Sequence, residues 1–193
     1  GKTQVLHRLA VQGYPVIDLE GLANHRGSAF GALGLEPQPG QKMFEALLWQ
    51  RLQKLESADY LLTEGESLHI GRLLVPKKFH QAMQVQTSLW LTASLEFRSR
   101  IILDDYPAID QLREQFEQPI CALKERLGNK VVNQLLELLH AGQWEKLVHE
   151  LMVHYYDPLY LHTYPEKRVE VDLEPFDDGV KRVAAALEQL VND

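Results

Sequence analysis

The first half of the chain shows helical and strand-like patterns of apolar residues in turn. Leu6, Leu9 and Ala10 share one face of a predicted helix that ends near residue 13, and a short strand follows at 16–18. The later elements are expected as a helix at 41–56, a buried strand at 60–62, a short helix that begins at Pro76 and a strand at 87–91. Strands that alternate with helices predict an α/β fold with a parallel sheet.

The second half is mostly helical in its pattern. One apolar stripe repeats at helical spacing within 131–139, and another lies within 144–155. The dipeptide Asp157-Pro158 is expected to break or bend the second of these helices, because proline removes a backbone donor. Residues 168–173 alternate like a strand, and 180–190 carry the stripe of a last helix.

These patterns divide the chain into an α/β part at 1–93 and a mainly helical part at 94–193 that packs on it. Residues 19–40 are rich in glycine and polar groups and are expected to form a long loop, which in a compact domain is typical of function. Ligands bind parallel sheets at the carboxyl ends of the strands. The start of the chain and the loops after Asp18 and Leu62 are therefore expected to converge there.

Composition limits the class of protein. Apolar residues make up 45% and charged residues 24% of the 193 residues, which is typical of a globular domain. The single cysteine excludes an internal disulfide framework, and the spacing of a zinc finger is absent. No stretch reaches the roughly 18 apolar residues of a membrane span, and no signal peptide opens the sequence. We expect a soluble protein of the cytoplasm.

The net charge of −7 is unevenly distributed. Residues 1–100 hold 11 Lys and Arg against 9 Asp and Glu, whereas 101–193 hold 9 against 18. Binding of nucleic acid draws on neutralised phosphates, so any contact with a polyanion is expected in the first half. The acidic second half is equally compatible with a surface that only maintains solubility.

The chain opens with Gly1-Lys2-Thr3 at the start of a helix that leads to a strand. This is the tail of a Walker A loop, in which the lysine reaches phosphate oxygens and the threonine hydroxyl holds Mg²⁺ or a phosphate. The backbone N–H groups of the helix N-terminus complete such an anion site. Three residues are also compatible with an ordinary helix start, so the motif alone leaves both interpretations open.

Several longer motifs give the sequence a resemblance to a known family, the bacterial tRNA 2-selenouridine synthases. The match runs in the family's order over nearly all of the chain. It is carried by the segment from Asp18 to Gly31 (DLEGLANHRGSAFG), by Glu64-Gly65-Glu66-Ser67, Ile70-Gly71 and Pro76, by Leu103-Asp104-Asp105-Tyr106, and by Tyr155-Tyr156-Asp157-Pro158-Leu159-Tyr160. The resemblance favours the interpretation of the first three residues as a phosphate site.

In this family, a rhodanese-like domain with a reactive cysteine precedes a P-loop domain. The chain resembles the P-loop domain alone, without its first strand and with its Walker A motif cut in the middle. The expected fold is thus a P-loop NTPase-like α/β domain with a helical C-terminal part. Cys121 lies outside the recognised motifs, and we interpret it as a residue of the core.

The resemblance implies a tRNA-modifying transferase. Wobble 2-thiouridine in the anticodon loop is S-geranylated from geranyl diphosphate, and selenium from selenophosphate then replaces the geranylthio group. The implied partners are tRNA, the upstream rhodanese domain and an enzyme that produces selenophosphate, with no membrane. Mg²⁺ is an expected cofactor, and no redox cofactor is expected.

The resemblance assigns phosphate binding to the start of the chain. Lys2 and Thr3, with Gly1, are expected on the phosphate, and Thr3 is the candidate ligand of Mg²⁺. Glu64 stands where a Walker B carboxylate lies, and it is expected to be catalytic by holding a water of the Mg²⁺ shell or by accepting a proton. Glu66 is a substrate candidate in the same loop. The alternative for both glutamates is a pair of solvated loop carboxylates.

The glycine-rich loop supplies the other phosphate candidates. Arg26 is also a catalytic candidate, because a guanidinium binds phosphate through paired contacts. Gly27 lets the backbone approach a ligand, and Ser28 offers a hydroxyl. His25 is a phosphate candidate, with a loop-bracing hydrogen bond as the alternative. Asp18 and Glu20 end the first strand, and one of them is interpreted as a cap for the loop.

Candidates for contact with substrate or tRNA lie along the rest of the chain. For the arginines and the run that ends at Tyr106, an ordinary charged helix face is the alternative. For Tyr156 and Tyr160, the alternative is a packed aromatic corner. These candidates are Ser67, Arg98, Arg100, Tyr106, Tyr156 and Tyr160.

A histidine metal site is not expected. Two of the candidate histidines are five residues apart, so they do not share a helix face. The histidines concerned are His140, His149, His154 and His162.

Two other functions fit the same residues. One is a P-loop kinase or NTPase that acts on a small substrate. The other is a module without catalysis that holds tRNA for the rhodanese domain.

Overall fold

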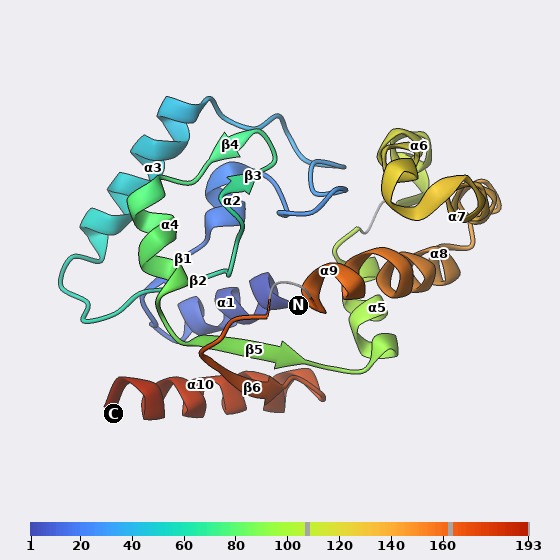
Figure 1. The fold of residues 1–193 in the computed structure, drawn as a ribbon. Coiled ribbons are helices and arrows are strands. Elements are labelled where there is room, and N and C mark those ends of the chain that lie inside the picture. The colour runs from blue at the N-terminus through green and yellow to red at the C-terminus, as the bar shows by residue number, and fades with distance from the viewer. Residues whose placement is uncertain (107–108, 162–163, 193) are drawn as a thin grey trace. The chain divides into compact units, whose positions relative to one another are not determined.

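The computed structural model describes residues 1–106, 109–161 and 164–192. The chain forms two compact units, Gly1–Thr92 with Pro165–Asp193, and Ala93–Tyr164 (Figure 1). The end of the α/β part near residue 93 agrees with the sequence pattern, but the segment after residue 164 returns to the first unit. The expected division into 1–93 and 94–193 therefore differs from the structure.

The first unit alternates helices with short strands. Its elements in chain order are α1 (Lys2–Val11), β1 (Val16–Ile17), α2 (Leu19–Ala23), α3 (Gln41–Lys54), β2 (Leu62–Thr63), β3 (His69–Ile70), β4 (Leu73–Leu74), α4 (Lys77–Gln84), β5 (Ser88–Thr92), β6 (Arg168–Asp172) and α10 (Phe176–Asn192).

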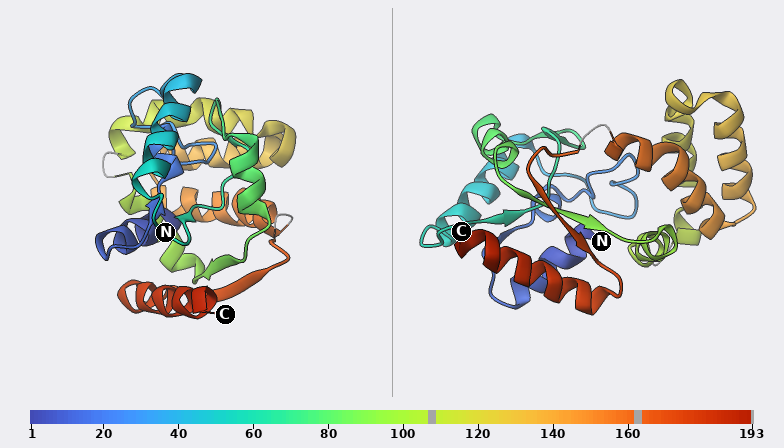
Figure 2. Two further views of the ribbon diagram at one scale, coloured as in Figure 1. Left: turned by 90° about the vertical axis from the view of Figure 1, so that its left-hand side faces the viewer. Right: turned by 60° about the horizontal axis from the view of Figure 1, so that its bottom comes forward.

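Parallel strand pairs confirm the predicted α/β class. β1 pairs in parallel with β2, with Val16 opposite Leu62. The segment that connects these two strands contains α2 and α3. β5 pairs in parallel with β6 over five residues, from Ser88 opposite Arg168 to Thr92 opposite Asp172. This pairing explains why the last segment belongs to the first unit, because β6 forms its hydrogen bonds with β5. Figure 2 shows α10 lying along β6.

Two features of the first unit differ from the expected loops. The segment after Asp18 begins with the helix α2, because the Asp18 carboxylate accepts a hydrogen bond from the Gly21 N–H at 2.6 Å and caps the helix. Asn24 ends α2 in the left-handed conformation. The segment after β2 contains the antiparallel hairpin β3–β4, whose turn includes Gly71 at a φ of +56°. Both elements are too short to show a hydrophobic period.

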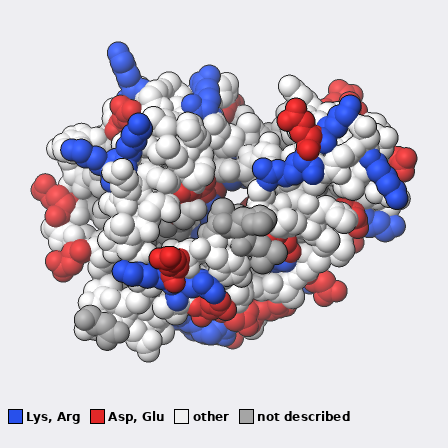
Figure 3. Space-filling view, viewed as in Figure 1, with Lys and Arg blue, Asp and Glu red and all other residues white. Residues whose placement is uncertain are grey.

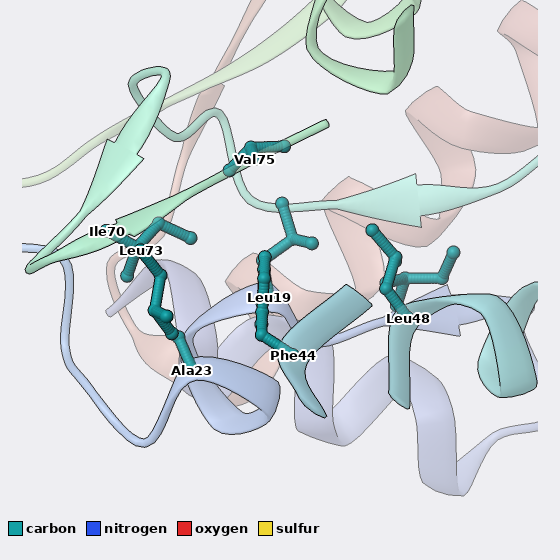
Figure 4. Packing of buried hydrophobic residues seen from close by; sticks show 8 residues of the cluster. Leu19, Ala23, Phe44, Leu48, Ile70, Leu73 and Val75 are labelled. Carbon is teal, nitrogen blue, oxygen red and sulfur yellow. The ribbon is translucent and has the colours of Figure 1, made fainter. Parts of the chain in front are cut away.

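The core of the first unit lies between α2, α3 and the β3–β4 hairpin (Figure 4). Phe44, which is fully buried, and Leu48 project from α3 at helical spacing, as the stripe at 41–56 predicts. They pack among buried apolar side chains of the other segments, which are Ile17, Leu19, Ala23, Ile70, Leu73 and Val75. This core fixes the positions of the loops that follow β1 and β2.

The second unit is helical throughout its described residues. Its elements are α5 (Leu95–Asp104), a 3₁₀ helix η1 (Ile109–Leu112), α6 (Arg113–Ala122), α7 (Lys124–His140), α8 (Trp144–Leu151), a π-helical segment η2 (Met152–Tyr156) and α9 (Asp157–Leu161). α7 contains one non-helical residue, Gly128. Contacts of α6 with α7, of α7 with α8 and of α8 with α5 hold the unit together.

The helix of the second stripe passes Asp157-Pro158 without ending. It widens into η2 just before the proline, which is a common way for a helix to absorb a missing backbone donor. Arg98 of α5 donates to Asp157 at 2.6 and 3.0 Å and so ties α5 to α9.

The interpretation of Cys121 as a core residue is wrong, because this cysteine is exposed. The buried face of α6 is formed by Phe116 and Ile120, which are four residues apart. Cys121 follows Ile120 by one position, which is about 100° around the helix and off that face.

The substitution Phe44→Ala is expected to lower the free energy of unfolding by about 3–5 kcal/mol, because it leaves a cavity in the core of the first unit. Trp49→Ala on the same helix is the matched control, since Trp49 is 62% exposed, and it should cost less than about 1 kcal/mol. Urea denaturation followed by circular dichroism measures both values. Equal losses for the two variants would contradict this account of the core.

Candidate functional site

Three segments that are far apart in sequence meet at the first turn of α1. Lys2 Nζ forms an ion pair with Glu66 of the loop after β2, and it lies 2.9 Å from Oε1 of Glu20 in α2. The Thr3 hydroxyl donates a hydrogen bond of 2.7 Å to Oε2 of Glu20. The predicted convergence of the chain start with the two loops is therefore confirmed.

The carboxylates of this site are buried. Glu20, Glu64 and Glu66 are 6%, 2% and 6% exposed, so the alternative of solvated loop carboxylates is wrong for the latter two. A buried carboxylate is costly unless a cation or a donor compensates it. Lys2 supplies one positive charge to both Glu20 and Glu66. Oε1 of Glu20 still receives no hydrogen bond of normal geometry, despite its closeness to Lys2 Nζ.

Glu64 is held in a position that favours its protonated form. Oε2 accepts hydrogen bonds from the Leu19 N–H at 2.9 Å and the Thr63 hydroxyl at 3.3 Å, whereas Oε1 receives none. Burial, together with the hydrogen bond and the negative charge of Asp18, raises the pKa of Glu64 to about 7. Protonation of Glu64 provides the donor for its hydrogen bond to Asp18.

Asp18 takes the opposite charge state to Glu64. Burial alone raises its pKa, but hydrogen bonds from Glu64, His7 and the Gly21 N–H outweigh burial and lower the pKa. The contact with His7 Nε2 measures 2.7 Å, and that histidine is largely exposed. Near neutral pH, an ionised Asp18 thus lies between a buried acid and a side chain in contact with water.

His25 is buried and braces the loop that follows α2. Its Nδ1 accepts a hydrogen bond from the Gly27 N–H at 3.1 Å, which places the ring hydrogen on Nε2. Burial lowers the pKa of His25, and repulsion by Arg26 lowers it further, while Glu20 acts in the other direction. The imidazole is therefore neutral near pH 7, and the loop-bracing alternative describes its contact in this structure.

Gly27 passes directly over the two carboxylates that Lys2 joins. A Cβ atom at this position would lie 2.5 Å from Glu66 Oε2 and 2.8 Å from Glu20 Oε1. The φ of Gly27 is +68°, a conformation that favours glycine. A side chain at this position would therefore have to displace one or both carboxylates.

The neighbours of Gly27 make contacts within their own loop. Arg26 Nη1 donates to the Leu33 carbonyl at 2.7 Å, and Ser28 Oγ accepts from the Phe30 N–H at 3.3 Å. Their assignment to phosphate stays a prediction.

Ser67, in the loop after β2, donates to the His69 carbonyl. The other substrate candidates belong to the second unit. Tyr106 is buried and packs edge-on against Phe116, and Tyr156 packs against Tyr155. Arg98 is engaged by Asp157, as described above, whereas Arg100 and Tyr160 are exposed. Their contact with tRNA stays a prediction.

The described histidines among these metal candidates lie beside acidic side chains, as in the contact of His140 with Glu117 at 2.7 Å. Across residues 1–106, 109–161 and 164–192, no three His, Cys, Asp or Glu side chains are placed to hold a metal ion. His149 and His154 instead flank Glu150 at 3.5 and 3.1 Å. His162 lies outside the described residues.

Sequence reasoning missed His7 as a residue of the site. Thr3 and His7 are four residues apart, so they share one face of α1. The four-residue spacing between Thr3 and His7 in a predicted helix is the signal that could have identified His7. Asp18 and Glu20 both line the site, and Asp18 is the residue that caps the loop.

Comparison with known protein families shows which family this chain belongs to. The family model described as the tRNA 2-selenouridine synthase AAA domain matches residues 1–192. The chain belongs to this family. Its α/β fold is of the P-loop type, as the first motif predicts.

Relatives in the tRNA 2-selenouridine synthase family are similar over most of the chain. The protein of that name from Shewanella frigidimarina is 32% identical and aligns with 89% of this chain and 53% of its own length. Its namesakes from Shewanella halifaxensis and Hydrogenovibrio crunogenus are 35% and 32% identical, with 86% and 94% of this chain covered. The chain spans about half the length of these curated relatives.

No solved structure matches the chain. The described part of the chain contains no helix that is both long and apolar enough to cross a membrane.

The residues of the site are compatible with the Mg²⁺ ion that a P-loop implies. Thr3 offers a hydroxyl, and Glu20 offers the buried oxygen Oε1, which receives no hydrogen bond of normal geometry although it lies 2.9 Å from Lys2 Nζ. Mg²⁺ prefers such oxygen ligands and usually shares them with phosphates and water. Thr3 and Glu20 are therefore the residues that would hold it.

Glu64→Gln is expected to change the pH dependence of stability. The pKa of Glu64 is raised from 4.5 to about 7 by folding, so its ionisation costs the folded state increasingly as the pH rises through this interval. Glutamine keeps both hydrogen bonds without a charge. The variant should match the wild type near pH 4.5 and exceed its free energy of unfolding by about 1–3 kcal/mol at pH 8.

Urea titrations at several pH values measure this difference. Asp18 titrates below its usual value of 3.8 and so does not contribute to the interval. If the free energies of unfolding of wild type and variant differed by the same amount at every pH, the pKa of Glu64 would not be raised by folding.

Gly27→Ala is expected to destabilise the first unit and disturb the carboxylates, because its Cβ would meet Glu66 and Glu20. Gly13→Ala is the matched control, since Gly13 also has a positive φ but has open space around it. We expect Gly27→Ala to cost about 1–3 kcal/mol more than the control, as measured by thermal unfolding. Equal costs would mean that only backbone strain matters.

Proposed function

We propose that the chain is the phosphate-binding half of an enzyme that converts wobble 2-thiouridine of tRNA into 2-selenouridine. The proposed route runs through an S-geranylated intermediate, with geranyl diphosphate and selenophosphate as co-substrates. The observation that carries the proposal is the cluster of Lys2 and Thr3 with Glu20 and Glu66 at the N-terminus of α1. The names of the relatives, tRNA 2-selenouridine synthase, support tRNA as the substrate.

Geranyl transfer makes a clear demand on this cluster. The thiocarbonyl sulfur attacks C1 of the geranyl group, the C1–O bond breaks, diphosphate leaves, and the uridine N3 loses its proton. In the proposal, the Lys2 ammonium and the N–H groups of the first turn of α1 neutralise the leaving diphosphate. Mg²⁺, when bound, supplies further positive charge at that diphosphate.

Glu64 is the group proposed to receive the proton. Its pKa of about 7 gives it a substantial ionised fraction at neutral pH, which suits a general base. Its hydrogen bond to Asp18 leads onward to His7 at the surface. The proton thus has a hydrogen-bonded route from the buried acid to solvent.

The second step is assigned to a larger assembly. Selenium from selenophosphate displaces the geranylthio group, and the family resemblance places a reactive cysteine in a rhodanese domain. We propose that selenation requires this domain and that the present chain supplies the phosphate site.

The experiment supplies geranyl diphosphate, Mg²⁺ and an anticodon stem-loop with wobble 2-thiouridine to the full-length protein that carries this chain. Mass spectrometry then measures geranyl transfer to the RNA. Lys2→Ala should lower the rate roughly 100-fold or more, because it removes a charge from the leaving group. Lys54→Ala, an exposed position on α3, is the control and should keep the wild-type rate.

The outcomes separate the alternatives. A Lys2→Ala variant that is folded and fully active would overturn the phosphate assignment. Release of phosphate from ATP without any transfer to RNA would favour a P-loop NTPase. RNA binding without transfer in every protein tested would favour a module that only holds tRNA.

A further inference from the structure

Exposed basic side chains gather around the β3–β4 hairpin of the first unit. Lys42 lies in the first turn of α3, Arg72 in the hairpin turn, and Lys77 and Lys78 in the first turn of α4. Figure 3 shows Lys and Arg side chains gathered over this region. We call these four residues the hairpin basic surface. Such a concentration is unusual in a chain with a net charge of −7.

Hydrogen bonds place the three elements at one end of the unit. Gln41 Nε2 donates to the Leu74 carbonyl at 2.8 Å, and Gln41 Oε1 accepts from the Leu74 N–H at 2.9 Å. The first turn of α3, which contains Lys42, is therefore fixed beside β4. Lys77 follows Leu74 by three residues, so the first turn of α4, with Lys77 and Lys78, begins close to the end of β4.

Arg72 is held in position before any ligand arrives. Its Nη2 donates to the Gln38 carbonyl at 2.6 Å, and its backbone N–H donates to Gln38 Oε1 at 2.9 Å. The side chain is nevertheless exposed. A guanidinium that is fixed in this way presents its remaining N–H groups at a lower cost in conformational entropy.

The lysines of the surface are not neutralised by ion pairs among the described residues, although Glu45 follows Lys42 by three positions on α3. No ion pair holds Lys42, Lys77 or Lys78 in the described part of the chain. The first turn of α4 contains two lysines and no acidic residue, a combination that destabilises a helix through its macrodipole. An anionic partner would relieve this repulsion.

The hairpin basic surface is adjacent to the candidate site. A Cβ on Gly71, the residue before Arg72, would lie 2.8 Å from Cδ2 of His25. His25 in turn holds the Gly27 N–H, and Gly27 passes over the carboxylates that Lys2 joins. The surface and the site are thus connected through directly packed residues of one unit.

We propose that the hairpin basic surface binds the sugar-phosphate backbone of the substrate RNA and so brings the target nucleoside to the adjacent site. This inference rests on the proposed function and names the part of the chain that recognises its macromolecular substrate. Four cations on three elements offer more positive charge than a single phosphate needs, which favours a polyanion such as an RNA backbone. They also provide an RNA contact in the half of the chain that has the positive charge balance.

The test measures the affinity of the chain for a fluorescein-labelled tRNA with 2-thiouridine at the wobble position, by fluorescence anisotropy at several salt concentrations. The variant Lys42→Gln/Lys77→Gln/Lys78→Gln should bind about 10–100-fold more weakly near 0.1 M salt. The slope of log affinity against log salt should fall by about 2–3. Arg72→Gln alone should weaken binding in the same direction.

The control removes the same charge elsewhere. Lys54→Gln/Lys124→Gln/Lys130→Gln changes three exposed lysines and should alter the affinity less than about twofold. Circular dichroism confirms that both triple variants are folded. Equal losses in the two variants, or no loss in either, would overturn the inference.

Two further outcomes would also overturn it. One is an absence of RNA binding by the wild type. The other is preferential binding to vesicles of phosphatidylserine and phosphatidylcholine, which would assign the surface to a membrane.

Geranyl transfer that persists in the hairpin variant with unchanged RNA affinity would reject the docking surface and leave the proposed function intact. RNA binding that depends on the hairpin basic surface, without any geranyl transfer, would support the docking surface and contradict the proposed function.

Discussion

The ion pairs of Lys2 with Glu20 and Glu66 are the interaction on which the candidate site depends. They join the start of α1 to α2 and to the loop after β2, which lie 18 and 64 positions further along the chain. The two carboxylates are almost fully buried, so water cannot compensate their charge. Gly27 passes close to both of these carboxylates, and its N–H donates to His25.

The same pairs set a condition for ligand binding. The site contains more carboxylates than lysines, since Glu20 and Glu66 share Lys2, Asp18 is ionised beside His7, and Glu64 is partly protonated. An incoming phosphate must therefore compete with carboxylates for Lys2. A site of this kind favours ligands that arrive with a divalent cation, because the cation compensates the carboxylates that lose their partner.

Much of the fold could be predicted from the sequence, because the longer helices and the strands have clear apolar periods. The meeting of the chain start with the loops after Asp18 and Leu62 follows from the rules of parallel sheets. The helix α2 and the β3–β4 hairpin could not be predicted, since five- and two-residue elements have no period and depend on capping and tertiary contacts. The burial of Glu64 was likewise invisible, because burial of a carboxylate depends on neighbours distant in sequence.

The parallel pairing of β5 with β6 has a consequence for the order of folding. The two strands are separated in the chain by the entire second unit, from Ala93 to Tyr164. That insertion is helical and rich in local contacts, so it can acquire structure while the ribosome is still translating the remaining codons. The first unit lacks β6 and α10 until residues 165–193 have been synthesised. A nascent chain therefore exposes the edge of β5 throughout this interval, and a truncation before β6 would leave that edge open to aggregation.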